Sequence, residues 1–281
     1  MKNQKHKKEL FRRLPPVTAV LAVSFGTACL SSREMDIGAA ERAIAARFPD
    51  YEVRSACSSR TVIGKLKARY GLETDGVKEA LERAACDGVR RLAVQPLYLS
   101  DGYEYAALEE MLKEYRGSFE RIVLGRPLLA SDADIRAAAG AVAGRSAEYD
   151  DGRTAVCFMG HGSAAVSDRV YEKLQEALAR EGYEHYYIAA MKAKPSLDDM
   201  RMRIRKHGGY QRIVLQPFLI TAGRHARLDM AGMKEDSWKN ILSGDGYEVI
   251  CLLEGLGRCP AIQDIYVSHV RDAAEKLKMP G

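Results

Sequence analysis

Two segments of nearly the same design occur in this chain, and this internal repeat limits the fold more than any other feature. Residues 92–97 (LAVQPL) and 213–218 (IVLQPF) are apolar runs that contain Gln-Pro, and a glycine follows six residues after each proline, at Gly102 and Gly223. Apolar runs of this length are typical of buried strands. The repeat predicts two α/β units of similar topology: an N-terminal extension (1–16), a first domain (17–149) and a second domain (150–281).

Within each half, apolar runs typical of strands alternate with stretches of helical periodicity. This alternation predicts right-handed crossovers and a parallel sheet in each domain. We therefore expect an α/β fold of two similar Rossmann-like domains, with parallel sheets flanked by helices and a cleft between the domains. The expected strands are 17–24, 51–56, 91–98, 122–125, 154–159, 186–191 and 212–219, and the expected helices are 36–48, 62–69, 77–85, 104–115, 167–181 and 197–207.

Composition and charge exclude several classes of protein. The 43 Lys and Arg residues and 38 Asp and Glu residues are spread along the chain, which disfavours a nucleic-acid-binding arm. No apolar run approaches the ~20 residues that a membrane span requires. The basic residues 2–13 and the apolar residues 17–25 resemble a signal peptide, but Pro15 and Pro16 interrupt that pattern. The six cysteines form no CxxC pair, so we expect mostly buried thiols in a reducing, cytoplasmic compartment.

An overlay of the two halves places histidines where a ligand is expected, because parallel α/β sheets bind ligands beyond the carboxyl ends of their strands. After the first strand of each half, Phe25 corresponds to His161. Two residues after the repeated glycines, Glu104 corresponds to His225. Neutral imidazole binds borderline divalent metals and accepts a proton near neutral pH. The overlay therefore predicts a metal or proton-transfer site in the second domain.

Each histidine also has a structural alternative. Glycines on both sides of His161 allow a sharp turn that exposes the ring, which favours a functional role. For His225 the charged neighbours Arg224, Arg227 and Asp229 are equally consistent with a solvated loop. The remaining histidines are expected in structural or surface positions: His207 as a helix C-cap, and His6, His185 and His269 at the surface.

Motifs for two other chemistries are incomplete. The turns at Gly26-Thr27 and Gly162-Ser163 resemble phosphate-binding turns, yet neither GxGxxG nor GxxxxGK[ST] occurs. Ser163 lies close to a histidine, but the GxSxG motif of hydrolases is missing. Basic residues follow several expected strand ends, where they could bind the carboxylates of an anionic ligand or form ordinary surface charge. These residues are Arg33, Arg60, Lys192, Lys194, Arg224 and Arg227.

Short ordered motifs run through most of the chain. They are 22–27 (AVSFGT) with 32–34 (SRE), 48–53 (FPDYEV) with 59–60 (SR), 94–97 (VQPL) with 102–105 (GYEY), 124–129 (LGRPLL), 159–163 (MGHGS), 222–226 (AGRHA), 229–232 (DMAG), 235–239 (EDSWK) and 255–257 (GLG). By these motifs the chain resembles the anaerobic-pathway sirohydrochlorin cobaltochelatases, which are class II chelatases with a ferrochelatase-like fold.

The resemblance implies ATP-independent insertion of Co²⁺ into sirohydrochlorin, or precorrin-2, in anaerobic cobalamin biosynthesis. Co²⁺ would be the substrate metal, with Ni²⁺ or Fe²⁺ as alternatives; no organic cofactor would be needed, and a homo-oligomer is left open. The family's metal-binding histidines match His161 and His225, which are the expected metal ligands and proton acceptors. The residues expected to contact the tetrapyrrole in the cleft are Ser24, Phe25, Gly26, Thr27, Arg33, Arg60, Tyr98, Gly102, Glu104, Gly162, Ser163, Lys192 and Arg224.

Two positions depart from the family pattern. Lys192 stands where family members commonly carry a metal-facing glutamate, and Tyr98 stands where many carry a histidine. At an effective dielectric of about 20, a unit charge reversal near a divalent ion changes its binding by several kcal/mol. The alternative function is therefore that of a non-catalytic or repurposed tetrapyrrole-binding member of the family. Retention of both histidines favours the enzyme.

Overall fold

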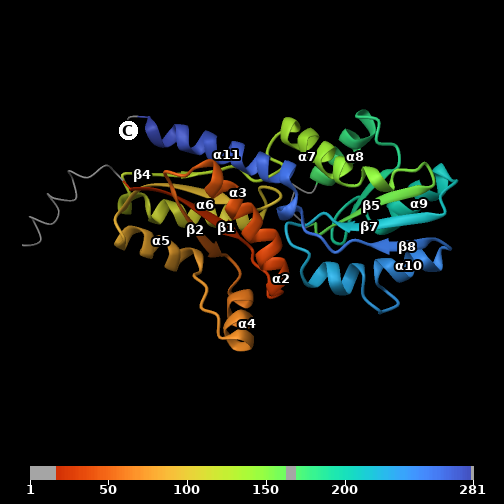
Figure 1. The fold of residues 1–281 in the computed structure, drawn as a ribbon, viewed down its shortest axis with the longest axis horizontal. Coiled ribbons are helices and arrows are strands. Elements are labelled where there is room, and N and C mark those ends of the chain that lie inside the picture. Colours follow the sequence, from red (N-terminus) through yellow and green to blue (C-terminus); the bar gives the residue numbers. More distant parts are fainter. Residues whose placement is uncertain (1–16, 163–168, 280–281) are drawn as a thin grey trace, which may run out of the picture.

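Two parallel four-stranded sheets form the frame of the protein (Figure 1). The computed structural model describes residues 17–162 and 169–279, so the predicted extension 1–16 and Ser163 lie outside the described residues. The strand order is β2-β1-β3-β4 in one sheet and β6-β5-β7-β8 in the other, which confirms the predicted α/β class. The strands are β1 (Val17–Ser24), β2 (Glu52–Cys57), β3 (Val89–Pro96), β4 (Arg121–Leu124), β5 (Thr154–Gly160), β6 (Tyr186–Ala190), β7 (Arg212–Pro217) and β8 (Glu248–Cys251).

The register of the sheets reproduces the repeat residue by residue. Pro96 of β3 is paired with Val23 of β1, and Pro217 of β7 is paired with Met159 of β5. Phe25 follows Val23 by two residues, and His161 follows Met159 by two residues. Phe25 and His161 therefore lie at the same place on the carboxyl edges of their sheets. This register confirms that His161 is the structural counterpart of Phe25.

Helices cover both faces of the sheets, which explains why the central strands are continuous apolar runs. Side chains of β1 alternate between the two faces: Leu21 and Val23 pack with α5 and α6, whereas Val20 and Ala22 belong to a core shared with α3 and α11. The longer helices are α3 (Gly38–Arg47), α4 (Arg60–Tyr70), α5 (Val77–Cys86), α6 (Tyr103–Glu114), α7 (Asp132–Arg145), α8 (Arg169–Arg180), α9 (Leu197–His207), α10 (Trp238–Gly244) and α11 (Pro260–Lys278). The short helical segments are α2 (Leu30–Ser32), η1 (Arg33–Ile37), η2 (Arg116–Ser118), η3 (Ala147–Tyr149), η5 (Ala226–Met230) and η6 (Leu256–Arg258).

Two helices pack across the division predicted at residue 149. Helix α7, from the first half of the chain, packs against α8, and α11, from the second half, packs against α3, β3 and β4 (Figure 1). One apolar core thus continues from the first sheet to the second. Four elements were not predicted from the sequence: α7, α10, β8 and α11. The buried face of α7 is mostly alanine, so its sequence has little apolar periodicity. The division at 149/150 stays a prediction.

The first predicted helix begins earlier than residue 36. Its first turns are α2 and the π-helical segment η1, and the regular helix α3 starts only at Gly38. Leu30 and Met35 are exposed in this region, so the apolar pattern that marks the rest of the helix is missing there. The π turn places Asp36 in the interior, where its side chain is completely buried.

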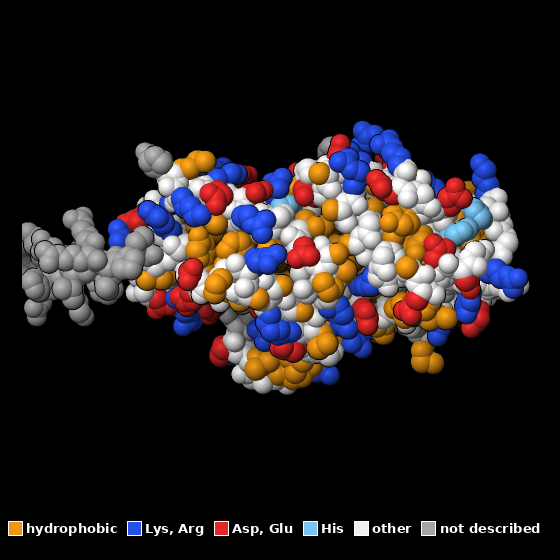
Figure 2. All heavy atoms as spheres, turned by 45° about the horizontal axis from the view of Figure 1, so that its top comes forward, with side chains coloured by type: hydrophobic (Ala, Val, Ile, Leu, Met, Phe, Trp, Pro, Cys, Tyr) orange, Lys and Arg blue, Asp and Glu red, His pale blue; other side chains and the backbone are white. Residues whose placement is uncertain are grey.

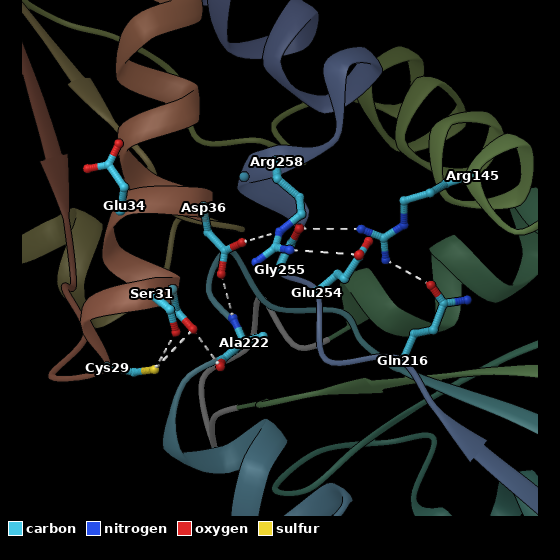
Figure 3. A network of polar contacts seen from close by, with 12 residues as sticks. Cys29, Ser31, Glu34, Asp36, Arg145, Gln216, Ala222, Glu254, Gly255 and Arg258 are labelled. Atoms are coloured by element: carbon cyan, nitrogen blue, oxygen red, sulfur yellow. Dashed lines mark hydrogen bonds and ion pairs between the residues drawn. The ribbon is translucent and has the colours of Figure 1, made fainter.

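A polar network built around Asp36 joins the two domains (Figure 3). The Asp36 carboxylate accepts hydrogen bonds from Arg258 Nε at 2.6 Å and from the backbone N–H of Ala222 at 2.9 Å. Ser32 Oγ donates to the carbonyl oxygen of Ala222 at 2.8 Å. Both backbone polar groups of Ala222 are therefore held by the first domain. Ala222 lies three residues before His225, so this network holds the loop just before that histidine.

The expected surface position of His269 is wrong. His269 lies on the inner side of α11 with 1% of its surface exposed. Its Nε2 is 3.1 Å from Asp134 Oδ1, and its Nδ1 is 3.2 Å from the carbonyl oxygen of Arg126. These partners satisfy both ring nitrogens of the buried histidine.

The six cysteines all lie in the described residues and carry free thiols. Only Cys57, Cys157 and Cys259 are buried, so the expectation of mostly buried thiols holds for half of them. Within the described part of the chain, none of the helices combines the length and apolar character that crossing a bilayer requires.

Candidate metal centre

His161 is the first residue after β5, at the carboxyl edge of the second sheet. The following residue, Gly162, has φ +71°, and a Cβ placed there would lie 2.7 Å from Ala193 Cβ and 2.8 Å from Ala193 N. The backbone N–H of Lys192 donates to the carbonyl oxygen of His161 at 3.0 Å. The turn after β5 is therefore packed directly on the loop after β6, and only glycine fits its second position.

Gly162→Ala is expected to lower the free energy of unfolding by about 2 kcal/mol, because it combines left-handed backbone with a steric overlap. Urea denaturation followed by circular dichroism measures the change. Gly64→Ala in α4 is the matched control, since no atom lies within 4 Å of its added Cβ; it should leave stability unchanged or raise it by up to about 1 kcal/mol. Equal behaviour of the two variants would contradict this account of the turn.

His225 lies at the start of a short helix in the loop after β7. The helix begins at Arg224, one residue after Gly223, and continues into the π-helical segment η5. Helix α6 likewise begins one residue after Gly102, so Glu104 and His225 occupy equivalent second positions of their helices, as the overlay predicts. One helical turn later, Asp229 Oδ2 is 2.6 Å from His225 Nδ1.

The two imidazoles face each other. Their ring centroids are 5.0 Å apart and their planes are inclined by 66°. The Nδ1 atom of His161 is 2.7 Å from the carbonyl oxygen of Gly162, and that of His225 contacts the carboxylate of Asp229. An acceptor at Nδ1 keeps the proton there and leaves the Nε2 lone pair available, which is the usual arrangement of metal-binding histidines. The pair can therefore supply two nitrogen ligands to one divalent ion.

Burial lowers the pKa of His161 below its ordinary value of 6.5, and the neighbouring His225 and Lys192 side chains act in the same direction. The carboxylate of Glu104, from the first domain, opposes this shift. His161 is consequently neutral near neutral pH, in the form that binds a metal or accepts a proton.

The profile of the cobalt chelatase (CbiK) family matches residues 18–275 of this sequence. The chain belongs to the cobalt chelatase family. It is 32% identical over 255 residues to the sirohydrochlorin cobaltochelatase of Salmonella typhimurium, an alignment that covers 91% of this chain and 96% of that protein. It is also 32% identical over 233 residues to the sirohydrochlorin cobaltochelatase CbiKC of Nitratidesulfovibrio vulgaris, covering 82% of each chain.

Solved structures support the fold of this cobalt chelatase family member. SirB from Bacillus subtilis superposes with a TM-score of 0.64 at 14% identity, covering 92% of this chain and 96% of SirB. CbiX, described as the terminal enzyme for biosynthesis of sirohaem in denitrifying bacteria, superposes with a TM-score of 0.54 at 18% identity, covering 91% and 99%. These comparisons confirm the chelatase-like arrangement of the two domains.

Lys192 is bonded through its backbone to His161, one of the two facing histidines of this chelatase. Its side chain is exposed, and its backbone N–H is bonded to the carbonyl oxygen of His161. The positive charge of Lys192 contributes to the lowered pKa of His161. Among residues 17–162 and 169–279, no group of three or more His, Cys, Asp or Glu side chains is arranged to hold a metal ion. The described centre thus consists of two imidazoles, with a lysine beside them.

Four of the expected substrate contacts belong to the first domain's edge. Ser24, Gly26, Thr27 and Arg33 line a cavity of about 180 Å³ between β1, β2, α3 and α4. A Cβ at Gly223 would lie 2.9 Å from Thr27 Oγ1, so the first domain's glycine turn touches the loop that carries His225. Of these four residues, Thr27 is therefore the one that contacts the loop of His225 across the domain interface.

The other expected contacts differ in exposure. Phe25 is 52% exposed, and Arg60, Glu104 and Arg224 are also exposed, whereas Tyr98 is 7% exposed and burial raises its pKa to about 12. Gly102 caps α6 and Gly162 is buried. The substrate-binding roles of all these residues stay predictions.

Three structurally important residues escaped the sequence reasoning. Asp229 belongs to the motif 229–232 and to the charged surroundings of His225, but it was given no role, although its spacing of four residues from His225 on a helix is a usable signal. Asp36 and Ala222 are 186 residues apart, and nothing in the local sequence around either one predicts their hydrogen bond.

Proposed function

We propose that this protein catalyses the ATP-independent insertion of Co²⁺ into sirohydrochlorin, or precorrin-2, during tetrapyrrole biosynthesis. The observation that carries the proposal is the facing pair His161 and His225, with both Nδ1 atoms occupied, in a chain of the cobalt chelatase family. Two relatives that match most of the chain are named as sirohydrochlorin cobaltochelatases, which supports this choice of metal and substrate. The same imidazoles would also suit Ni²⁺ or Fe²⁺.

In the proposed reaction the macrocycle exchanges two pyrrole protons for one divalent cobalt ion. The Nε2 atoms of His161 and His225 hold the ion next to the macrocycle and accept protons as it leaves. The lowered pKa of His161 keeps that ring unprotonated, and the Asp229 carboxylate, in contact with Nδ1, orients the ring of His225. No redox step or organic cofactor enters this scheme.

The surroundings of the pair suit a polyanionic substrate in a reducing compartment. Arg33, Arg60, Lys192 and Arg224 are available to bind the carboxylate side chains of sirohydrochlorin at the edge of the centre. The visible face in Figure 2 shows acidic and basic side chains interspersed, without the single-sign patch expected of a nucleic-acid-binding surface. Six free thiols support a cytoplasmic location.

The second candidate function is tetrapyrrole binding without metal insertion, and Lys192 is the observation that favours it. An ammonium group beside the histidines opposes the entry of a divalent cation, and it attracts a substrate carboxylate. The two functions predict different spectra with the same ligand.

An anaerobic absorbance assay with sirohydrochlorin and Co²⁺ separates these candidates. The proposal predicts that catalytic amounts of protein accelerate the conversion of the free-base spectrum to the cobalt spectrum over the uncatalysed rate. A stoichiometric, bound but unmetallated spectrum would instead establish the tetrapyrrole binder. Protein that changes neither the spectrum nor the rate would contradict both.

Lys192→Glu is expected to tighten Co²⁺ binding about tenfold at low ionic strength, since it replaces repulsion by attraction at an exposed, partly screened position. Titration calorimetry with Co²⁺ measures the change. Lys192→Gln should fall between the two, and Lys65→Glu, on an exposed position of α4, makes the same change in net charge away from the histidines. An unchanged affinity in Lys192→Glu would show that the ammonium group acts elsewhere.

A further inference from the structure

A second pair of histidines lies at the opposite edge of the second sheet. His185 directly precedes β6, and His207 is the last residue of α9. Their ring centroids are 5.3 Å apart and the planes are inclined by 76°. Lys192 follows the other end of β6, and its backbone N–H is bonded to His161. At ~3.3 Å per residue, the strand between His185 and Lys192 separates the two histidine pairs by about 20 Å. The second pair is therefore outside the candidate insertion site.

The Nδ1 atoms of this pair are occupied in the same manner as those of His161 and His225. His207 Nδ1 is 3.1 Å from the carbonyl oxygen of Gly208, which can only accept, so this nitrogen carries the proton. His185 Nδ1 is 2.9 Å from the Tyr210 hydroxyl. Tyr210 in turn is 2.8 Å from the Tyr187 hydroxyl, to which it can donate while accepting from His185. With His185 donating from Nδ1 to Tyr210, both rings present Nε2 as the lone pair that can bind a metal.

Packing holds the two rings in place. Tyr210 stacks on His207 with centroids 4.8 Å apart and planes inclined by 22°, and it meets His185 edge-on at 5.7 Å. Tyr210 is buried, so the rings rest on a rigid base, while His207 is exposed and His185 is half-buried. In Figure 2 histidine side chains are visible on the surface at the end of the molecule formed by the second sheet. An ion from solvent can reach this position.

The spacing of the rings fits a shared metal ion. With metal–nitrogen bonds of ~2.1 Å and tetrahedral angles, the centroids of two imidazoles bound through Nε2 lie about 5 Å apart. The separation of 5.3 Å meets this requirement as closely as the 5.0 Å of His161 and His225. Imidazole nitrogen prefers borderline divalent ions such as Co²⁺, Ni²⁺, Cu²⁺ and Zn²⁺ over Mg²⁺ or Ca²⁺.

We propose that His185 and His207 form a second site for a borderline divalent transition-metal ion, with water completing its coordination. The site is independent of the insertion centre and uses its own two imidazoles. It gives the protein a place to hold an ion of the same class as its expected substrate metal, at the edge of the sheet away from the macrocycle.

The test is the stoichiometry of Co²⁺ binding to tag-free protein without tetrapyrrole, measured by equilibrium dialysis and calorimetry. Wild type should bind one more Co²⁺ ion than the double variant His185→Ala/His207→Ala. Any Co²⁺ binding that remains at the second site of the variant should be at least tenfold weaker than in wild type. Insertion of Co²⁺ into sirohydrochlorin at saturating metal should be unchanged in that variant. His161→Ala/His225→Ala should keep the second ion.

Tyr187→Phe is the matched control, because it removes a hydroxyl from the same cluster without removing an imidazole; it should retain the ion. A spectroscopic readout on wild-type protein guards against misfolding of the variants: paramagnetic Co²⁺ should broaden the ring proton signals of both His185 and His207 in nuclear magnetic resonance spectra. Wild-type stoichiometry in His185→Ala/His207→Ala, or sharp signals from both rings at saturating Co²⁺, would overturn the proposal.

Discussion

Replacing either His161 or His225 with alanine is expected to lower the rate of Co²⁺ insertion by a factor of about 10²–10⁴, the usual contribution of a positioned acid–base group. Each substitution removes one of the two facing imidazoles, to which the proposed function assigns metal binding and proton acceptance. The anaerobic absorbance assay gives the rate, and titration calorimetry gives the accompanying loss of Co²⁺ affinity. Because the rings act on one ion, the double variant should be little worse than either single variant.

Two further variants show whether the loss comes from the metal centre itself. Asp229→Asn leaves both imidazoles in place but removes the negative charge 2.6 Å from His225 Nδ1, so it should cost about tenfold or more in metal affinity or rate. His6→Ala removes a histidine from the N-terminal residues and should leave the rate unchanged. Near-normal turnover in both His161→Ala and His225→Ala would remove these residues from the mechanism.

Asp36→Ala is expected to lower the free energy of unfolding by about 3–5 kcal/mol, the usual effect of removing one partner of a buried ion pair. The Asp36 side chain is fully buried, and its loss leaves the Ala222 N–H without an acceptor and the Arg258 guanidinium with only its 3.7 Å ion pair to Glu254 (Figure 3). Because Ala222 lies in the loop that carries His225, three residues before that histidine, the same variant should also weaken Co²⁺ binding. Denaturant titration followed by circular dichroism measures the first effect and calorimetry the second.

Glu34→Ala is the matched control, in the same π-helical segment and two residues away. Glu34 forms an exposed ion pair with Arg42, which contributes at most about 1 kcal/mol. The account requires a much larger loss in Asp36→Ala than in Glu34→Ala. Equal stabilities of the two variants would mean that the network in Figure 3 does not hold the domains together.

Much of the frame could be predicted from the sequence because it rests on local patterns. The strands are apolar runs that end at turn residues, and the Gln-Pro repeat predicted two units of similar topology. The overlay of the first strand ends matched His161 with Phe25, and the observed register, with Pro96 paired to Val23 and Pro217 to Met159, agrees with that match. The same local patterns predict both facing histidines at one edge of the second sheet.

The features that the prediction missed depend on contacts between distant segments. The Asp36–Ala222 hydrogen bond and the exchange of α7 and α11 between the domains have no local signature. His269 is different, since it falls on the same face of α11 as the buried Ile262, Ile265 and Tyr266, at helical spacings. The helical periodicity of residues 260–278 is therefore a local signal for an interior position of this histidine.

The central claim is that His161 and His225 hold the cobalt ion and pass it to the macrocycle. Cobalt K-edge X-ray absorption tests it most directly, on His185→Ala/His207→Ala protein loaded with one equivalent of Co²⁺, before and after anaerobic addition of sirohydrochlorin. The account predicts imidazole scattering before the addition, absent when His161 and His225 are also replaced, and a square of pyrrole nitrogens afterwards. A first spectrum without imidazole scattering, or a spectrum that does not change on addition of the tetrapyrrole, would contradict it.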